Sequence, residues 1–465
     1  MIRKNYFNYS LIILMLTVSI YFFGSVILND CNNSRLFAFL FIIVFLFVLS
    51  LLKFRFVVDK IFAFVFPIAV GITKCVWIAQ PITNSIGILQ VGAGLYVNMM
   101  DIILLYFAFR SVNYKRKNKN PLSISIILFF FSILLSCMFA NKIEFALAGL
   151  FLYLKCFVLY SFFSVYPEFD RIQKPLLLGV YCSLTFQGIV STLQMINNGP
   201  IGLQALGESE SAMRYRLVDG IIQRSPAGLF DHSSNLAIFS IFALLITFFC
   251  EKNKTIKFVV LSIGLYLLLI AAARTVIVAL IIVLFYGLWK YRKRLLKLKY
   301  ALSFVVGIAL AFIAFVVMIK ENMLDFFTNS DFIYQIGDRF SQWNLALSYI
   351  FKRWGIIGYG INNYTSVTTE TGNSSFIYLN PVHNNYLLYW FELGIIGLLL
   401  YIIIFVCCYR YGKNFKKLKQ IKKTGLLFVA CVFLYNFAGW SFATSMSIYL
   451  FWSALGFVDQ ESKEI

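Results

Sequence analysis

The chain has 465 residues, of which 60% are hydrophobic and 13% are charged, and its mean hydropathy is +0.81. This balance is far from that of soluble domains and indicates a polytopic membrane protein. The formal net charge is +21. Because membrane proteins concentrate Lys and Arg in cytoplasmic loops, this charge does not require a nucleic acid partner, and we expect none. The nine cysteines show no CxxC or metal-ligand spacing, so we expect them to be packing residues.

Apolar runs near the length needed to cross a bilayer recur along the chain. They predict an all-α polytopic integral membrane protein with about 14 transmembrane helices, about 12–14 being plausible. The expected spans are 10–28, 36–52, 61–79, 95–110, 122–140, 146–164, 175–196, 234–250, 258–272, 274–289, 301–319, 384–409, 424–440 and 442–458. The chain then divides into an N-terminal membrane helix bundle (1–319), a long outer loop (320–383) and C-terminal membrane helices (384–465).

The basic residues give these spans a direction. Arg3 and Lys4 precede the first span, which lacks a small-x-small cleavage site and is expected to be retained. With the N-terminus inside, most of the 41 Lys and Arg residues fall on the cytoplasmic side, the largest groups being in 290–299 and 410–423. We therefore expect both termini in the cytoplasm.

The segment 258–289 is too long for one span and short for two. Lysines precede it, and the basic group 290–299 follows it. Both flanks are therefore expected in the cytoplasm, so the segment must turn back as a hairpin with Arg274 at its outer tip.

Two outer segments are long, 197–233 and 320–383. Such loops usually carry function. Within the second, the pattern predicts a helix near Asp338–Phe351 that ends at the glycines 355, 358 and 360.

His383 is the central candidate for chemistry. Asn380 is expected to cap a helix with Pro381 at its first position, which puts His383 in the first turn. The positive end of the helix dipole disfavours imidazolium, so His383 should be neutral near pH 7 and able to accept a proton. The alternative is a satisfied histidine at the end of a membrane helix.

The periodicity of that helix makes further predictions. Trp390, Gly394 and Gly397 share the face of His383, whereas Glu392 points nearly opposite. The two glycines would let a neighbouring helix approach closely beneath the histidine.

Three outer arginines, Arg224, Arg274 and Arg339, are candidates for phosphate binding, because a guanidinium grips phosphate oxygens with two bonds. Arg274 is a lone charge in an apolar hairpin, where ionisable residues are functional candidates, although an arginine that snorkels to the interface gives the same pattern. For Arg224 and Arg339 the alternative is a solvated loop charge. His232 directly precedes a span. It fits either the N-terminal flank of a helix or a hydrogen-bond donor to a phosphate.

The sequence contains no HExxH, DxD, Walker or GxSxG motif and no His/Asp metal cluster. This argues against a metalloprotease, an ATPase, a serine hydrolase and a metal-dependent sugar-nucleotide transferase. A neutral base surrounded by arginines suits transfer between an anionic lipid-linked donor and a hydroxyl acceptor.

Four stretches in this order resemble the bacterial O-antigen polymerase / O-antigen ligase family over about residues 220–400. They are QRSPAGLF (223–230) followed by Asn235-Leu236-Ala237, then Ala273-Arg274-Thr275, then Arg339 and Trp343 with Gly358-Tyr359-Gly360 and Asn363, and lastly His383-Asn384-Asn385 through Glu392, Gly394, Gly397 and Leu398. Ala273 stands where the family usually has Ser, and the usual Pro before the Gly-x-Gly is replaced.

The resemblance implies a GT-C-like, metal-independent, inverting glycosyltransferase without a cofactor, acting on undecaprenyl-diphosphate-linked glycans at the periplasmic face of the bacterial inner membrane. His383 would activate or position the acceptor hydroxyl, and Arg224, Arg274 and Arg339 would hold the diphosphate. The further substrate-binding candidates are His232 and Asn384, and the residues for structural support are Glu392, Gly394, Gly397, Gly358 and Gly360. The implied partners are a lipid-linked glycan donor, a glycan acceptor, the bilayer and a chain-length regulator.

Within that family, polymerases and ligases share these motifs, and the sequence alone does not separate them; we favour a polymerase. A flippase or transporter for lipid-linked sugars would be expected to show inverted repeats or polar, broken spans, and neither is clear in the sequence. A sensor or scaffold would not need His383 and three arginines on one side.

Overall fold

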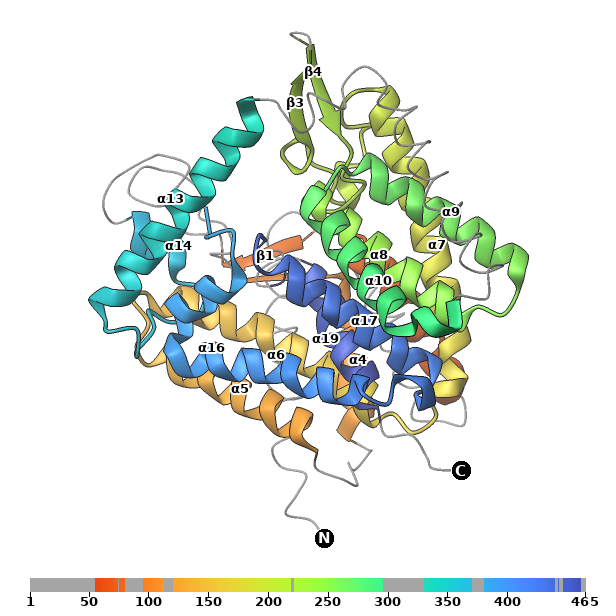
Figure 1. The fold of residues 1–465 in the computed structure, drawn as a ribbon, viewed down its shortest axis with the longest axis horizontal. Helices are drawn as coiled ribbons and strands as arrows, with labels where there is room; N and C mark the ends of the chain where they lie inside the picture. The colour runs from red at the N-terminus through yellow and green to blue at the C-terminus, as the bar shows by residue number, and fades with distance from the viewer. Residues whose placement is uncertain are drawn as a thin grey trace, which may run out of the picture.

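The computed structural model describes residues 55–73, 75–79, 95–112, 120–218, 221–295, 330–369, 380–439, 442 and 446–460. This part of the chain is mostly helical (Figure 1). The expected spans 10–28, 36–52 and 301–319 lie outside the described residues.

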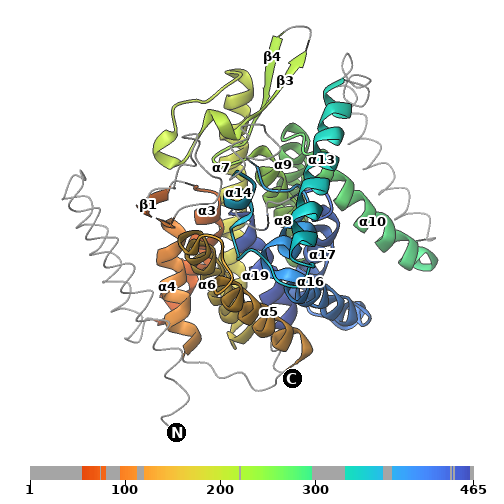
Figure 2. The same ribbon diagram turned by 90° about the vertical axis from the view of Figure 1, so that its left-hand side faces the viewer.

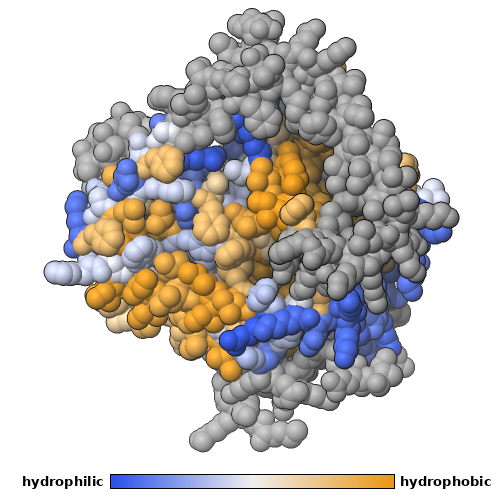
Figure 3. Space-filling model, viewed as in Figure 1, coloured by the Kyte–Doolittle hydropathy of each residue, from blue (hydrophilic) through white to orange (hydrophobic). Residues whose placement is uncertain are grey.

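Four described helices are long and apolar enough to cross a membrane: α6 (Ile143–Val165), α7 (Phe169–Ile196), α8 (Ser233–Cys250) and α16 (Asn385–Gly412). Shorter apolar helices accompany them, namely α5 (Pro121–Cys137), the Arg274–Phe285 part of α10 (Arg274–Leu295), and α19 (Ser447–Asp459). The remaining helices are α3 (Arg55–Val70), α4 (Met99–Val112), α9 (Lys254–Ile270), α13 (Ser330–Lys352), α14 (Tyr364–Thr368) and α17 (Gln420–Tyr435). Hydrophobic residues gather on the surface over α5 and α16, as lipid contact requires (Figure 3).

The hairpin predicted for 258–289 is confirmed. Helix α9 ends at Ile270, and α10 begins at Arg274 after a three-residue turn. Ala272 has a φ of 50° in this turn. Arg274 therefore lies at the tip of two helices that return to the same side of the molecule.

The spans expected at 61–79 and 95–110 are not helical throughout. The end of the first and the start of the second are strands. Strand β1 (Cys75–Ala79) pairs antiparallel with strand β2 (Leu95–Asn98). The run Cys-Val-Trp-Ile-Ala suits a strand because β-branched and aromatic residues pack well on a pleated surface. The chain returns to helix at Met99, because Asn98 Oδ1 accepts the Met100 N–H at 3.0 Å and Asp101 Oδ2 accepts the Asn98 N–H at 2.7 Å.

The core lies where α6 and α19 pack together with α5 and α16. Trp452, the largest side chain that is almost fully buried, packs there against Phe129 and Tyr153. Lys155, which the sequence places within a span, forms a buried ion pair of 2.8 Å with Asp101. A charge in apolar surroundings is costly unless it is paired, and Asp101 provides the partner.

Helix α13 confirms the helix predicted inside the long loop, although it starts earlier, at Ser330. In both ribbon views α13 and the hairpin formed by β3 (Arg214–Val218) and β4 (Ile221–Ser225) project beyond the helix bundle (Figures 1 and 2). In Figure 2 the short helix α14 lies below the hairpin and nearer the helix bundle. These elements position the residues described next.

Candidate active site

His383 lies just before α16 and not in its first turn. The helix begins at Asn385, and Asn384 is its N-cap, with Oδ1 accepting the N–H groups of Tyr386 at 2.9 Å and Leu387 at 3.1 Å. The expected cap at Asn380 is therefore wrong, because the Asn nearest the apolar run satisfies the free N–H groups of the first turn. Asn384 thus holds the helix start next to His383.

Gln342 of α13 contacts the histidine. Its Oε1 lies 2.8 Å from His383 Nδ1 and 3.3 Å from the His383 backbone nitrogen. Gln342 is fully buried, whereas His383 is partly exposed. The long loop is thereby joined to the start of α16 at the candidate base.

The imidazole of His383 is neutral at physiological pH. Its pKa is lowered to about 3, first by burial and then by the charges of Arg339, His232 and Arg214. The neutral state expected from the sequence is confirmed, but the causes are burial and nearby cations.

Arg339 and Arg274 bring two cations into the same region. They are close enough to repel each other, and Arg339 also interacts electrostatically with Tyr435. Burial lowers the pKa of Arg339, although a guanidinium remains charged at any physiological pH. Crowding of like charges is costly unless an anion binds among them.

The hairpin β3–β4 presents its two described arginines on opposite faces. Arg214 pairs with Ser225, and Arg224 pairs with the neighbouring Tyr215. Because successive strand residues alternate between faces, Arg214 and Arg224 point apart. The positive charge of Arg214 contributes to lowering the pKa of His383. The Arg224 guanidinium instead forms an ion pair with Glu210.

His232 is the N-cap of α8. Its Nδ1 accepts the Ser234 N–H at 3.1 Å, so the helix-flank interpretation is borne out. A neutral His232 then carries its hydrogen on Nε2, which remains a donor. Protein atoms crowd around the ring although water reaches it, and this desolvation, with Arg214, lowers its pKa to about 4.

The glycines form a junction between the long loop and α16. Gly394 has φ 73° and ψ −175°, which breaks α16. The N–H groups of Tyr359 and Gly360 then donate to the carbonyls of Phe391 and Glu392, each at 2.9 Å. The expectation that Gly394 and Gly397 admit a neighbouring helix is wrong, because a loop fills the break and Gly397 contacts Leu393 of its own helix.

Glu392 supports the same junction. Its Oε1 accepts the Tyr364 N–H at 3.3 Å, at the start of α14, and its side chain is buried. Gly360 has a φ of 94°, so the Gly-x-Gly turn requires glycine at that position.

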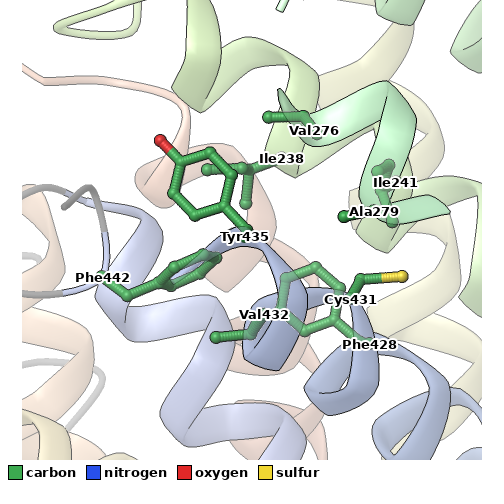
Figure 4. A pocket seen from close by; sticks show the side chains of 9 residues that line it. All are labelled: Ile238, Ile241, Val276, Ala279, Phe428, Cys431, Val432, Tyr435 and Phe442. Atoms are coloured by element: carbon green, nitrogen blue, oxygen red, sulfur yellow. The ribbon is translucent and has the colours of Figure 1, made fainter. Parts of the chain in front are cut away.

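An apolar pocket lies between α8, α10 and α17 (Figure 4). It is lined by Ile238, Ile241, Val276, Ala279, Phe428, Cys431, Val432, Tyr435 and Phe442. The hydroxyl of Tyr435 marks one end in Figure 4, and Tyr435 is the residue that interacts with Arg339. Val276 is two residues from Arg274. Tyr435 and Val276 therefore place one end of the pocket near the region of Arg339 and Arg274.

The structure brings together His383, Arg274, Arg339 and His232 and places Arg224 on another face. Gln342 and Arg214 join the site although the sequence did not single them out as site residues. Gln342 lies three residues after Arg339 and therefore on the same face of α13; this spacing is the signal that identifies it. No group of three or more His, Cys, Asp or Glu that could hold a metal occurs within the described ranges.

These features define a helical membrane protein whose site combines a neutral histidine with several arginines at one end of its helices. Residues 258–402 match the family model described as O-antigen ligase. This region, which holds Arg274, Arg339 and His383, is therefore similar to the O-antigen ligase family, in agreement with the motif resemblance. No curated protein matches the chain.

Proposed function

We propose that this protein polymerises oligosaccharide repeat units linked to undecaprenyl diphosphate, producing an O-antigen, capsular or other exopolysaccharide. The observation that carries the proposal is the neutral His383 beside Arg339 and Arg214, in a region matched by the O-antigen ligase family model. A base and several cations are what transfer from a lipid diphosphate to a hydroxyl requires.

In the proposed reaction an acceptor hydroxyl oxygen attacks the anomeric carbon of the donor sugar. The bond from that carbon to the diphosphate oxygen breaks, and undecaprenyl diphosphate leaves. His383 takes the hydroxyl proton, a role worth about 10²–10⁴-fold in rate. Attack opposite the leaving group inverts the anomeric configuration.

Negative charge develops on the leaving diphosphate. Arg274 and Arg339, together with Arg214, supply fixed positive charge at this point and stabilise the transition state without a metal ion. Arg224 would contribute only from the other face of the hairpin, where it pairs with Glu210.

The apolar lining of the pocket suits contact with the isoprenoid tail of the donor, although its enclosed volume of about 10 Å³ is too small to hold the tail. Its lining is apolar apart from the Tyr435 hydroxyl. A diphosphate held by Arg274 and Arg339 would place the attached chain at the mouth of this pocket, so that the tail enters from the bilayer between α8 and α10.

The charge pattern supports a periplasmic site in a bacterial inner membrane. His383 and the basic connection 413–423 lie at opposite ends of α16. Because basic connections remain in the cytoplasm, the histidine end faces the periplasm and both termini are cytoplasmic. The architecture is then GT-C-like, and a chain-length regulator is a natural partner for a polymerase.

The test is a reaction with purified protein in lipid nanodiscs and synthetic undecaprenyl-diphosphate-linked repeat units. We expect polymer and free undecaprenyl diphosphate, with and without EDTA, and neither product from His383→Ala. Lipid A-core offered as the acceptor separates the alternatives, since a ligase would use it and a polymerase would extend repeat units. Movement of intact lipid-linked units without bond cleavage would indicate a flippase and contradict the proposal.

A further inference from the structure

The contact between Gln342 and His383 fixes the orientation of both side chains. The His383 backbone nitrogen lies 3.3 Å from Gln342 Oε1. A backbone N–H only donates, so the amide atom that faces it must be the oxygen, and the reversed amide would set two donors against each other.

The same oxygen determines the tautomer of the imidazole. Gln342 Oε1 lies 2.8 Å from His383 Nδ1. Because an amide oxygen only accepts, Nδ1 must carry a hydrogen. In a neutral ring the other nitrogen, Nε2, then carries the lone pair.

The amide nitrogen of Gln342 indicates that the contact with His383 determines how the amide is oriented. Gln342 Nε2 is buried and has no hydrogen-bond partner among the described residues. An unsatisfied buried donor is destabilising. The side chain nevertheless keeps its oxygen on the histidine and leaves a donor for a ligand oxygen.

We propose that Gln342 is a positioning residue that holds His383 with its hydrogen on Nδ1, so that Nε2 accepts the proton of the acceptor hydroxyl. This inference rests on the proposed function of His383.

A neutral amide suits this place better than a carboxylate. In the Ser-His-Asp arrangement a carboxylate fixes the histidine tautomer and also stabilises the imidazolium. Here a carboxylate at position 342 would lie three residues from Arg339 on α13 and would compete with the diphosphate for that guanidinium. Gln342 fixes the tautomer and leaves the arginines to the substrate.

The experiment uses the full chain in nanodiscs with ¹⁵N-labelled histidine. The chain has only two histidines, so the spectrum contains two imidazoles. A His232→Asn variant identifies the signals of His383, and Asn is chosen because it also caps helices. Gln342→Met removes the acceptor at similar side-chain length, and Gln342→Glu restores it. Asn344→Met on the exposed face of α13 is the matched control.

At pH 7 we expect wild-type His383 to be protonated on Nδ1 and unprotonated on Nε2. Gln342→Met should show mixed or reversed tautomers, with kcat reduced about 10- to 100-fold and donor KM changed less than about threefold. Gln342→Glu should keep the hydrogen on Nδ1 and raise the pKa of His383, because a carboxylate stabilises the imidazolium. Arg339 and Arg214 still lower that pKa in every variant. Asn344→Met should change neither spectrum nor rate.

A wild-type His383 protonated on Nε2 would overturn the inference, as would Gln342→Met with an unchanged tautomer and rate. The proposed function fails differently: a His383→Ala variant with full turnover would remove the base, and this inference with it. An inactive His383→Ala combined with the wrong wild-type tautomer would overturn the role of Gln342 alone.

Discussion

Gly358 packs against Gly394 at the point where α16 breaks. A Cβ on Gly394 would lie 3.0 Å from the Gly358 nitrogen and would also collide with the Ile356 carbonyl. A Cβ on Gly358 would collide with the backbone of Glu392. Neither position has room for a side chain, so the pair joins the loop after α13 to the helix after His383.

Gly394→Ala should therefore destabilise the protein. The backbone at φ 73° and ψ −175° belongs to a region used almost only by glycine, where another residue costs about 1–3 kcal/mol. We expect a lower midpoint in thermal unfolding followed by size-exclusion chromatography. Gly412→Ala is the control, because a Cβ there meets nothing within 4 Å. Equal midpoints for the two variants would show that the break in α16 is not needed.

The acid limb of the pH profile should lie far below neutrality. The pKa of His383 is lowered from 6.5 to about 3 by burial and then by Arg339. The base is therefore neutral, and active, at every pH above that value. We expect kcat/KM, which reports the free enzyme, to be flat between about pH 7 and 5. Each sample is returned to pH 7 to verify its integrity, and a half-loss near pH 6.5 would contradict the lowered pKa.

Arg214→Gln and Arg224→Gln should separate the two faces of the hairpin. Removing Arg214 takes away one of the cations that act on His383, so the pKa of His383 should rise. Donor KM should also increase, about tenfold for one lost charge-assisted bond. Arg224→Gln should leave the pKa of His383 unchanged, because Arg224 pairs with Glu210. NMR titration and donor saturation curves measure both effects. A larger KM increase for Arg224→Gln would restore Arg224 as the diphosphate ligand.

Arg274→Lys keeps the charge at the hairpin tip but not the planar fork. If Arg274 grips the diphosphate with two bonds, a lysine cannot replace them, and polymer yield should fall about tenfold. If it only anchors the hairpin, lysine should snorkel equally well and the yield should stay near normal. Arg171→Lys is the matched control, because Arg171 is exposed and pairs with Glu168 at 3.0 Å. Arg274→Ala fails under both hypotheses and decides nothing.

Topology is tested with reporter fusions. Fusions after Lys299 and Lys423 should read cytoplasmic, because both follow basic groups. A fusion near Gly372 should read periplasmic. A cytoplasmic signal at Gly372 would put His383 on the wrong side for a periplasmic donor and remove the lipid-diphosphate argument.

The sequence predicted the class, the hairpin at Arg274 and the helix in the long loop, because these depend on apolar length, on charge and on helical spacing. The prediction from sequence failed where two local structures were both compatible with the same residues. Asn380 and Asn384 both suit a helix start, and only packing decides in favour of Asn384. Residues 75–79 are apolar enough for a span, but their partner strand begins at Leu95.

Residue type alone singled out His383 and Arg339, and the structure places them within electrostatic reach of each other. Gln342 was missed because an amide has no distinctive chemistry until a partner is known. Arg224 was grouped with Arg274 and Arg339 because a sequence does not reveal the register of two short strands. A shift of β4 by one residue would move Arg224 to the face of Arg214.

The junction at Gly394 also determines how α13 can move. The Gly355 carbonyl accepts hydrogen bonds from Ile395 N–H at 3.1 Å and from Trp390 Nε1 at 2.8 Å, so α13 is fixed to α16 at its C-terminal end. Arg339 lies about 20 Å along the helix from that end. A rotation of about 10° about the fixed end would carry Arg339 through about 3 Å, leave Gly355 in place and draw Gln342 away from His383. A glycan bound against α13 would therefore change the angle between α13 and α16, and the distance from Arg339 to Arg274 would measure that angle.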